Sequence, residues 1–287
     1  MIWRTRDLVS RLGTTLVPPQ VGYRLAVKRR PGDADAIEAR VTAEVARVLG
    51  DADLASRAGQ KFLGSLACDD LDALTSVSWP HVLRQHSFTV EGGENLPASG
   101  PVVLASFHLG GGFRVFDALI GRGLRPAFLR QPFGGSPSAY QRTIEAARAR
   151  YFATHLGDRL IAVGPDARAR LQAHLESGGA AVALLDVAPA SLGLRDRARV
   201  SFLGREIELA AGLMRLASRM QIPVLPYDGR IEDGRRVLTF HPASRAEDPE
   251  QLLQATIASL EGVVRERPWD WQGWLDVDRF FAAAAAQ

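Results

Sequence analysis

Apolar residues recur through the first third of the chain at the spacing of a helix. The clearest set, three or four positions apart, is Ile37, Val41, Val45 and Val48. The same periodicity continues from Leu54 to Leu74. A stripe that repeats about every 3.6 residues lets a helix bury one side. We therefore expect residues 1–85 to form a helical layer that packs on the rest of the chain within one domain.

From residue 86 onward, short apolar runs alternate with amphipathic stretches. The runs typical of strands are 86–92, 101–107, 124–130, 159–164, 181–187, 222–228 and 235–241. The stretches typical of helices are 112–121, 138–155, 166–177, 207–220 and 249–266. This alternation predicts an α/β fold over residues 86–281, with a mixed and largely parallel central sheet flanked by helices. The alanine-rich end, 282–287, is expected to be a disordered tail.

One turn signal modifies the parallel arrangement. Glu232-Asp233-Gly234 separates the last two expected strands, and Asp-Gly between apolar runs is typical of a β-hairpin. At least one strand should therefore run antiparallel to its neighbour. The final helix is expected to begin at Asp248-Pro249-Glu250, where Asp caps the helix and Pro takes its first position.

The segment PVVLASFHLGGGFRVFDALIG contains the strongest chemical signal in the chain. An apolar strand ends at Phe107-His108, three glycines follow, and a helix begins near Gly112. His108 therefore lies at the carboxyl end of a strand, where open α/β sheets bind ligands, and faces a helix N-terminus that can hold an oxyanion. We predict His108 as a general base, and the backbone amides of Gly110, Gly111 and Gly112 as oxyanion donors. The alternative is a structural histidine in a tight turn.

Three chemistries use a loop of this kind. A dinucleotide-binding fingerprint needs a third small residue where this chain has Val115. An esterase loop needs a G-x-S-x-G segment, which the sequence lacks. The remaining chemistry is a histidine that deprotonates a hydroxyl or an amine as that group attacks a thioester.

Four blocks in order extend this interpretation: FTVEGGENLPASGPVVLASFHLGGG, AVALLDV, VSFLGREIELAAGLMRLASRMQIPVLPY and ERPWDWQGWLDVDRF. Together they resemble the lysophospholipid acyltransferase superfamily, in its branch of late lipid A acyltransferases and phosphatidylinositol mannoside acyltransferases. The resemblance runs from residue 80 to Phe281. It implies a glycerol-3-phosphate acyltransferase-like fold. It also implies acyl transfer from acyl carrier protein (acyl-ACP) or coenzyme A (acyl-CoA) to a lipid hydroxyl, with no permanently bound cofactor.

The chain departs from this family at one catalytic position. The family motif is a histidine followed, after four intervening residues, by Asp or Glu; His108 matches, but the acid position holds Phe113. Loss of the orienting acid in a comparable serine triad lowers the rate about 10⁴-fold. Two carboxylates are candidates to replace it. Asp117 lies one helical turn beyond Phe113, about 5–6 Å further, within reach through a water. Asp186 ends another expected strand. Either could instead be a solvated or capping carboxylate.

Candidates for substrate binding surround the SFLGRE block. Several arginines gather there: Arg195, Arg197, Arg199 and Arg205. Such a cluster would attract a phosphopantetheine or coenzyme A phosphate, or an acidic carrier protein. Its alternative is pairing with nearby carboxylates: Asp196, Glu206 and Glu208. The resemblance implies that Phe202, Gly204 and Gly212 help to bind acceptor or donor, with Gly204 at a turn.

The C-terminal region contains three tryptophans: Trp269, Trp271 and Trp274. Their indole rings suit either a membrane interface or the last buried contacts of the domain, and core packing is favoured. The histidines other than His108 are His81, His86, His155, His174 and His241. They are scattered without metal-binding spacing, so no metal is expected.

Composition limits the remaining possibilities. The 287 residues are 46% hydrophobic and 23% charged, as in a globular protein with a sizeable core rather than a disordered or fibrous one. The balance of 35 basic and 32 acidic residues gives a net charge of +3, which does not indicate a nucleic-acid partner despite a pI near 9.4. Cys68 is the only cysteine, which excludes an intramolecular disulfide and a multi-cysteine zinc site. The sequence shows neither a secretion signal nor a membrane anchor, so a cytoplasmic location is expected.

Three functions remain open at this point. The first is acyl transfer to a lipid, with acyl carrier protein as partner and peripheral contact with the inner face of the cytoplasmic membrane. The second keeps the fold and the thioester donor but uses a small acceptor of specialised metabolism, which the missing anchor and the altered acid position favour. The third is a catalytically silent homologue that binds lipid or carrier protein, which the missing acid also favours.

Overall fold

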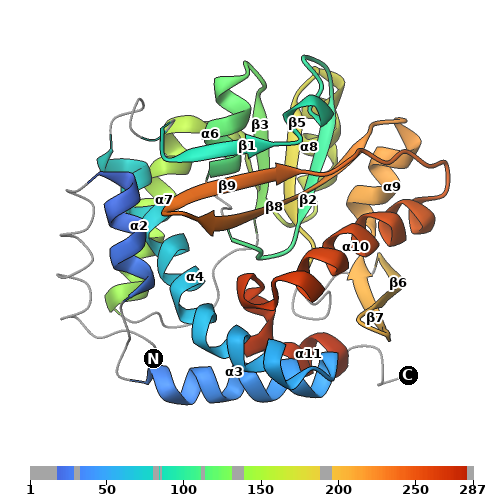
Figure 1. Cartoon of the computed structure of the whole chain (residues 1–287). Helices are drawn as coiled ribbons and strands as arrows, with labels where there is room; N and C mark the ends of the chain where they lie inside the picture. The colour runs from blue at the N-terminus through green and yellow to red at the C-terminus, as the bar shows by residue number, and fades with distance from the viewer. Residues whose placement is uncertain are drawn as a thin grey trace.

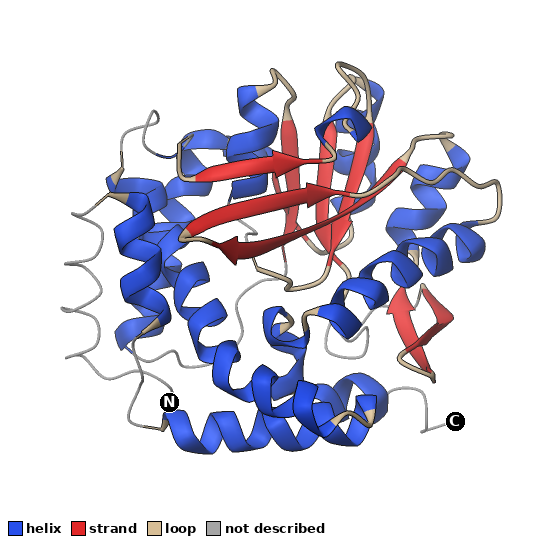
Figure 2. Cartoon of the chain, viewed as in Figure 1, coloured by secondary structure: helices blue, strands red, loops and turns tan. Residues whose placement is uncertain are grey.

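The computed structural model describes residues 18–28, 33–79, 84, 86–110, 114–130, 139–187 and 196–282. Within these ranges, seven strands form one sheet in the order β1-β9-β8-β2-β5-β3-β4, with helices packed around it (Figure 1). The strands are β1 (Phe88–Glu91), β2 (Val102–Ser106), β3 (Pro126–Arg130), β4 (Leu160–Ala162), β5 (Ala180–Leu184), β8 (Val224–Glu232) and β9 (Arg235–Phe240). Neighbouring strands run parallel except β8 and β9. The expected α/β fold with a mixed, largely parallel sheet is confirmed (Figure 2).

β2 and β5 lie in the interior of the sheet, and their sequences explain why. The segments VVLAS and AAVAL are almost wholly apolar, and nearly all of their side chains are buried. Strands that helices cover on both faces need apolar residues at every position. Ser106 at the end of β2 pairs with Leu184 at the end of β5. The residues that follow these two positions therefore emerge together at the carboxyl edge of the sheet.

The hairpin expected at Glu232-Asp233-Gly234 is present between β8 and β9. Glu232 pairs with Arg235, which leaves Asp233 and Gly234 as a two-residue loop. Both loop residues have positive φ, 49° and 75°. A loop of this geometry follows the right-handed twist of the strands, and Asp-Gly adopts it readily. This local signal accounts for the antiparallel pair in the described sheet.

The N-terminal helices are α2 (Pro19–Val27), α3 (Ala34–Leu49) and α4 (Ala52–Ser78). The helical periodicity of the first third is confirmed for α3 and α4. Asp51 caps α4, since its Oδ1 accepts a hydrogen bond of 2.8 Å from the Leu54 amide. Val41, Val45 and Phe62 belong to the same apolar core as residues of β2 and β5. These helices therefore share a core with the sheet.

The other helices are α6 (Arg114–Gly121), α7 (Ala139–His155), α8 (Ala167–Glu176), α9 (Gly212–Arg219), α10 (Pro249–Glu266) and α11 (Val277–Ala282). α6 and α7 contribute Phe116 and Phe152 to the core on one face of the sheet. α10 belongs with α3 and α4 to the core on the other face. It spans the expected residues 249–266, and Asp248 caps it by accepting from the Glu250 amide at 2.9 Å.

A second, two-stranded sheet was missed by the sequence pattern: β6 (Arg197–Phe202) and β7 (Arg205–Ala210) pair antiparallel. The helix expected at 207–220 is therefore wrong in its first part, and α9 begins at Gly212. In β6 the buried residues are Ala198, Val200 and Phe202, at every second position, which is the period of a strand. Leu203-Gly204, with φ of 52° and 75°, forms the turn between the strands.

Some of the sequence predictions fall outside the described residues. They concern 1–17, Gly111, Gly112, Phe113, Arg195 and 283–287. Ala282, the first residue of the expected tail, is instead the last residue of α11. Across the ranges that are described, every helix is too short or too polar to cross a membrane.

Candidate active site

His108 follows β2 and begins the loop that leads to α6. The Leu109 amide donates to the Phe107 carbonyl at 2.7 Å, which closes a tight turn around His108. Gly110 continues the turn with φ 61°. A Cβ at this position would lie 2.8 Å from the Gly229 carbonyl oxygen. The turn therefore needs glycine here, both for its backbone conformation and for the space.

Asp186 is the carboxylate that the structure brings to His108. Ser106 pairs with Leu184, so the residues two positions later, His108 and Asp186, lie side by side. His108 Nδ1 is 2.8 Å from Asp186 Oδ1, and the His108 backbone amide donates to Asp186 Oδ2 at 2.9 Å. With Nδ1 engaged by the carboxylate, Nε2 is the ring nitrogen left to meet a substrate. The His108 side chain is 41% exposed, whereas that of Asp186 is 2% exposed.

A third donor holds the Asp186 carboxylate. The Trp271 indole Nε1 donates to Asp186 Oδ2 at 2.9 Å. Trp271 is fully buried, and its ring packs edge-on against Phe202 with 5.4 Å between centroids. The backbone N–H of the next residue, Gln272, donates to the backbone carbonyl of His108 at 3.0 Å. The segment around Trp271 therefore fixes the positions of both His108 and Asp186.

Sequence reasoning did not assign Trp271 to the site. Core packing, the favoured expectation for the three tryptophans, is confirmed for Trp271 and Trp274, which are fully buried. Trp269 instead lies under Lys61, with Nζ 4.2 Å from the ring centroid. A buried indole needs an acceptor for its N–H. That requirement is the signal that could have linked Trp271 with a buried carboxylate.

The surroundings of His108 and Asp186 favour the ionised pair. The imidazole of His108 is partly exposed, but the surrounding protein removes much of its hydration, and this loss by itself would lower its pKa. The charge and the hydrogen bond of Asp186 have the larger effect and raise the pKa of His108 above its usual value. Burial would raise the pKa of Asp186, yet the charge of His108 and hydrogen bonds from His108 and Trp271 hold it below its usual value. More distant charges act too, since Arg148 lowers the pKa of His108 and Asp69 raises it.

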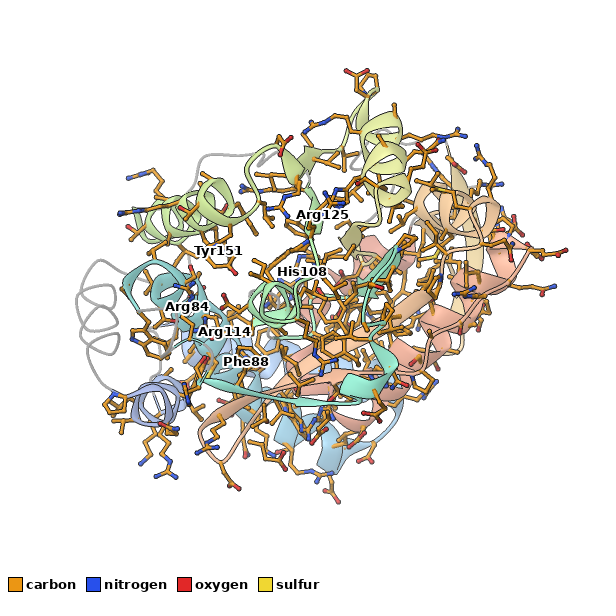
Figure 3. All side chains as sticks on the ribbon, turned by 90° about the horizontal axis from the view of Figure 1, so that it is seen from above. Arg84, Phe88, His108, Arg114, Arg125 and Tyr151 are labelled. Atoms are coloured by element: carbon orange, nitrogen blue, oxygen red, sulfur yellow. The ribbon has the colours of Figure 1, made fainter. Side chains whose placement is uncertain are left out.

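Asp117, the other candidate acid, lies in a different environment. Its Oδ1 accepts from the Tyr151 hydroxyl at 3.0 Å and from Arg84 Nε at 3.3 Å, and its Oδ2 accepts from Arg114 Nη1 at 3.0 Å. Figure 3 shows His108 beside α6, with Tyr151 reaching toward α6 from α7. Asp117 is buried, and its three donors account for both of its oxygens. Asp117 therefore belongs to a buried network of polar and charged side chains, and Asp186 is the carboxylate that pairs with His108.

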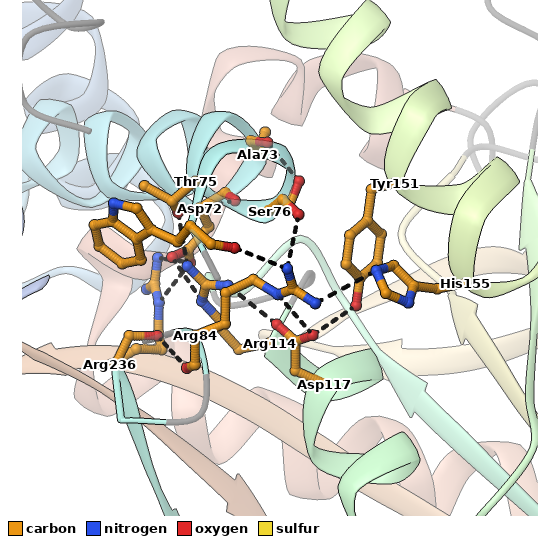
Figure 4. A network of polar contacts seen from close by, with 12 residues as sticks. Asp72, Ala73, Thr75, Ser76, Arg84, Arg114, Asp117, Tyr151, His155 and Arg236 are labelled. Carbon is orange, nitrogen blue, oxygen red and sulfur yellow. Dashed lines mark hydrogen bonds and ion pairs between the residues drawn. The ribbon is translucent and has the colours of Figure 1, made fainter. Parts of the chain in front are cut away.

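The network around Asp117 continues through Arg114 to α4 and β9 (Figure 4). Arg114 Nε lies 3.2 Å from Asp72 Oδ1. Arg236 Nη2 lies 2.8 Å from Asp72 Oδ2 and 2.7 Å from Asp69 Oδ1. Buried guanidinium and carboxylate groups need such pairing, because neither can lose its water without compensation. Through the pair of Arg114 with Asp72, the network attaches the first residue of α6, which follows the glycine loop, to α4.

Phe202, Gly204 and Gly212, which the resemblance implied as binding residues, lie on or beside the β6–β7 hairpin. Gly204 occupies the turn, as expected. Phe202 is buried, and its ring meets that of Phe107 edge-on with 5.2 Å between centroids. It therefore supports the residue before His108 from inside the core. Gly212 is the first residue of α9.

The arginines of this hairpin contact groups of the protein itself. Arg197 Nη1 lies 3.2 Å from Glu208 Oε2, and Arg199 Nε lies 3.9 Å from Glu208 Oε1. Arg205 lies over the Phe281 ring, 5.0 Å from its centroid. Of the two interpretations of these arginines, pairing with a nearby carboxylate is the one seen for Arg197 and Arg199.

Within the described ranges, no three histidine, cysteine, aspartate or glutamate side chains gather where they could hold a metal ion. At this edge of the sheet, the described groups that could take part in chemistry are the His108 imidazole, the Asp186 carboxylate and the backbone amide of Gly110. No protein-family model and no curated protein matches the chain.

Proposed function

We propose that this protein is an acyltransferase that moves an acyl group from a thioester donor to a hydroxyl or amine acceptor. The observation that carries the proposal is the 2.8 Å contact between His108 Nδ1 and Asp186 Oδ1 at the carboxyl edge of the sheet. It provides an oriented base beside a glycine loop. It also provides the acid that the sequence motif lacks at Phe113. The partly exposed imidazole leaves Nε2 on the side where a substrate can approach.

The reaction would proceed by general base catalysis. His108 Nε2 accepts the proton of the acceptor O–H or N–H as that oxygen or nitrogen attacks the thioester carbonyl carbon. Asp186 keeps the proton on Nδ1 and stabilises the imidazolium that forms. Backbone amides of the loop at Gly110–Gly112 would meet the negative charge on the carbonyl oxygen. The C–S bond then breaks, and the departing thiolate takes the proton from His108, which restores the free base.

The remaining parts of the proposal follow from the sequence resemblance. The donor would be acyl-ACP or acyl-CoA, and the protein would belong to the lysophospholipid acyltransferase superfamily. The acceptor would be a lipid hydroxyl, reached by peripheral contact with the inner face of the cytoplasmic membrane. A small acceptor of specialised metabolism would use the same base and the same donor.

A catalytically silent protein is the rival from another class. Its main support was the loss of the acid at Phe113. Asp186, held by the backbone amide and ring Nδ1 of His108 and by the Trp271 indole, removes the need for an acid at that position. This observation favours an enzyme over a binding protein.

An intact-mass assay on acyl carrier proteins tests the proposal. The carrier is incubated with the protein and a panel of lipid and small acceptors, and loss of the acyl group from the carrier is followed together with its gain by the acceptor. We expect transfer that requires both an acceptor and His108, so that His108→Ala abolishes it. His241→Ala is the matched control, because His241 also pairs with a buried carboxylate, that of Asp228 at 2.7 Å, outside the site. Binding without transfer to any acceptor, or equal turnover by His108→Ala, would contradict the proposal.

A further inference from the structure

Arg236 of β9 is a fully buried cation held by two carboxylates of α4. Its Nε donates to Asp72 Oδ2 at 3.0 Å, and its Nη2 donates to Asp69 Oδ1 at 2.7 Å (Figure 4). Nη1, the third nitrogen, has no hydrogen-bond partner among the described residues. A buried donor without an acceptor costs folding free energy, and a buried ion pair is weak evidence of stabilisation. Stability alone therefore does not explain why the fold places a guanidinium here.

Nη1 of Arg236 lies against the turn that follows β2. A Cβ at Gly110 would lie 3.1 Å from Nη1 and 2.8 Å from the Gly229 carbonyl oxygen. Gly229 belongs to β8, and its N–H donates to the Leu109 carbonyl at 3.0 Å. Gly229 pairs with Leu238, two residues beyond Arg236 on β9, so Arg236 and position 229 share one face of the sheet. Because glycine has no side chain, β8 places none between Arg236 and Gly110 at that position.

A second route joins Arg236 to His108 through Asp69 and Gln272. While Asp69 Oδ1 accepts from Arg236, its Oδ2 accepts from Gln272 Nε2 at 2.5 Å. The backbone N–H of Gln272 donates to the His108 carbonyl at 3.0 Å. Trp271, the residue before Gln272, carries the indole that donates to the carboxylate of the proposed site. We call this connection the Arg236–Asp69–Gln272 chain.

We propose that the members of the Arg236–Asp69–Gln272 chain are positioning residues, which fix the turn of His108 in place beside Asp186. A planar guanidinium contacts two carboxylates in fixed directions, and in this fold that leaves Nη1 directed at the turn. The role rests on the proposed function for the reaction that it serves. The placement of His108 can nevertheless be measured without that reaction.

Gln272→Met tests the chain with little risk to folding, because it removes the side-chain donor to Asp69 and keeps the backbone N–H that meets His108. A misplacement of about 1 Å costs about 10²-fold in rate. We therefore expect kcat to fall by about tenfold or more, with KM unchanged, because orientation of the base is lost rather than substrate binding. Gln254→Met is the matched control, since the Gln254 amide also bridges two groups, the N–H and the carbonyl of Ser201. A kcat for Gln272→Met equal to that of this control would overturn the proposal.

Arg236→Lys tests the other end of the chain. Lysine keeps the charge but lacks the planar fork, so it cannot hold both carboxylates in the same geometry. We expect kcat to fall by about tenfold or more in protein that urea unfolding shows to be folded; if the variant does not fold, Gln272→Met decides. Arg230→Lys is the matched control, because Arg230 lies on the same hairpin, pairs with Glu91 and Glu232, and is on the opposite face of the sheet. Wild-type kcat in folded Arg236→Lys would contradict the role of Arg236.

The double variant shows whether the two ends act through one connection. If they do, Arg236→Lys combined with Gln272→Met should turn over no more slowly than the slower single variant, because the connection is already broken. A rate reduced by the product of the two single effects would mean that Arg236 and Gln272 act independently, and the chain would be overturned.

The placement of His108 is also measured in the absence of substrate. The pKa of His108 depends on its contact with Asp186, and the charges of Arg148 and Asp69 act on it too. Neither Gln272→Met nor Arg236→Lys changes a charge, so a looser contact with Asp186 should lower this pKa toward its usual value in an NMR titration.

This titration separates the positioning role from the proposed function. If the His108 pKa falls in both variants but wild type transfers no acyl group, the proposed function fails and the positioning role stands. If wild type transfers acyl groups while neither variant changes kcat or the His108 pKa, the positioning role fails and the function stands.

Discussion

Replacing Asp186 with Asn tests the proposed base at its most sensitive point, because the substitution keeps the shape of the side chain and removes its charge. Asp186 Oδ1 meets His108 Nδ1, and Oδ2 accepts from the His108 amide and the Trp271 indole. An Asn side chain has one oxygen and one NH₂ group. With the oxygen at the Oδ2 position, Asn keeps two of the three donors. Its NH₂ group then faces Nδ1 of His108.

That orientation changes the tautomer of the imidazole. Nδ1 must accept a hydrogen bond from the Asn NH₂ group, so the ring proton moves to Nε2. A protonated Nε2 cannot take the proton of the acceptor. In a comparable triad the same substitution lowers kcat about 10⁴-fold, for this reason. We expect a loss of that order for Asp186→Asn.

The pKa of His108 should change in the same variant. Asp186 holds this pKa above its usual value against the effect of lost hydration. Without the carboxylate charge and its hydrogen bond, the loss of hydration becomes the largest effect, so the pKa of His108 should fall below its usual value. A raised histidine pKa contributes stability that is fully present below about pH 6.5 and is lost as pH rises through the folded-state pKa. Asp186→Asn should therefore destabilise the protein more at pH 5.5 than at pH 8.5.

Three measurements check this prediction: acyl-transfer kinetics, NMR titration of His108, and urea unfolding at both pH values. Asp278→Asn is the control, because that side chain is 76% exposed and its partner, Arg47, lies on the surface. Turnover by Asp186→Asn within tenfold of wild type would refute the role of Asp186. An unchanged His108 pKa would refute the electrostatic part of the reasoning.

Three further substitutions separate the site from its support. Trp271→Phe keeps an aromatic ring in the core but removes the N–H that donates to Asp186. If the lost hydrogen bond contributes about 1.5 kcal/mol to positioning Asp186, kcat should fall about tenfold. A kcat equal to that of wild type would exclude a positioning role for Trp271. Gly110→Ala forces a Cβ to within 2.8 Å of a carbonyl oxygen at φ 61°; we expect about 1–3 kcal/mol of destabilisation in urea unfolding, and an unchanged midpoint would show that the loop relaxes freely. Asp117→Ala leaves two buried arginines without their shared carboxylate; about 3–5 kcal/mol should be lost, and a loss below 1 kcal/mol would mean that the network contributes little.

Local patterns in the sequence were enough to locate most of the elements. The strands after residue 86 that lie in the main sheet, the helix at 249–266 and the turn at Asp233-Gly234 each depend on a periodicity or a backbone preference within a few neighbouring residues. The β6–β7 hairpin was missed because its second strand does not alternate, since Ile207, Glu208 and Leu209 are buried in succession. Burial at every second position is seen only in its first strand, β6. His108 at the end of a strand also follows from local pattern alone.

The tertiary structure decided which carboxylate serves His108. Asp117 is closer to His108 along the chain, but both of its carboxylate oxygens already accept hydrogen bonds, from the Tyr151 hydroxyl, Arg84 and Arg114. Asp186 is 78 residues from His108. It reaches Nδ1 because β2 and β5 are neighbours in register, a relation that no local pattern contains.

The amino-acid sequence by itself determined the α/β class, the positions of most strands and helices, and a histidine with a glycine loop at the end of β2. Those features arise from interactions between near neighbours in the chain. The tertiary structure decided the partner of that histidine and placed the indole of Trp271 where it donates to that partner. These depend on strand order and helix packing, which join segments far apart in sequence, and the free energy of that packing is a property of the whole fold.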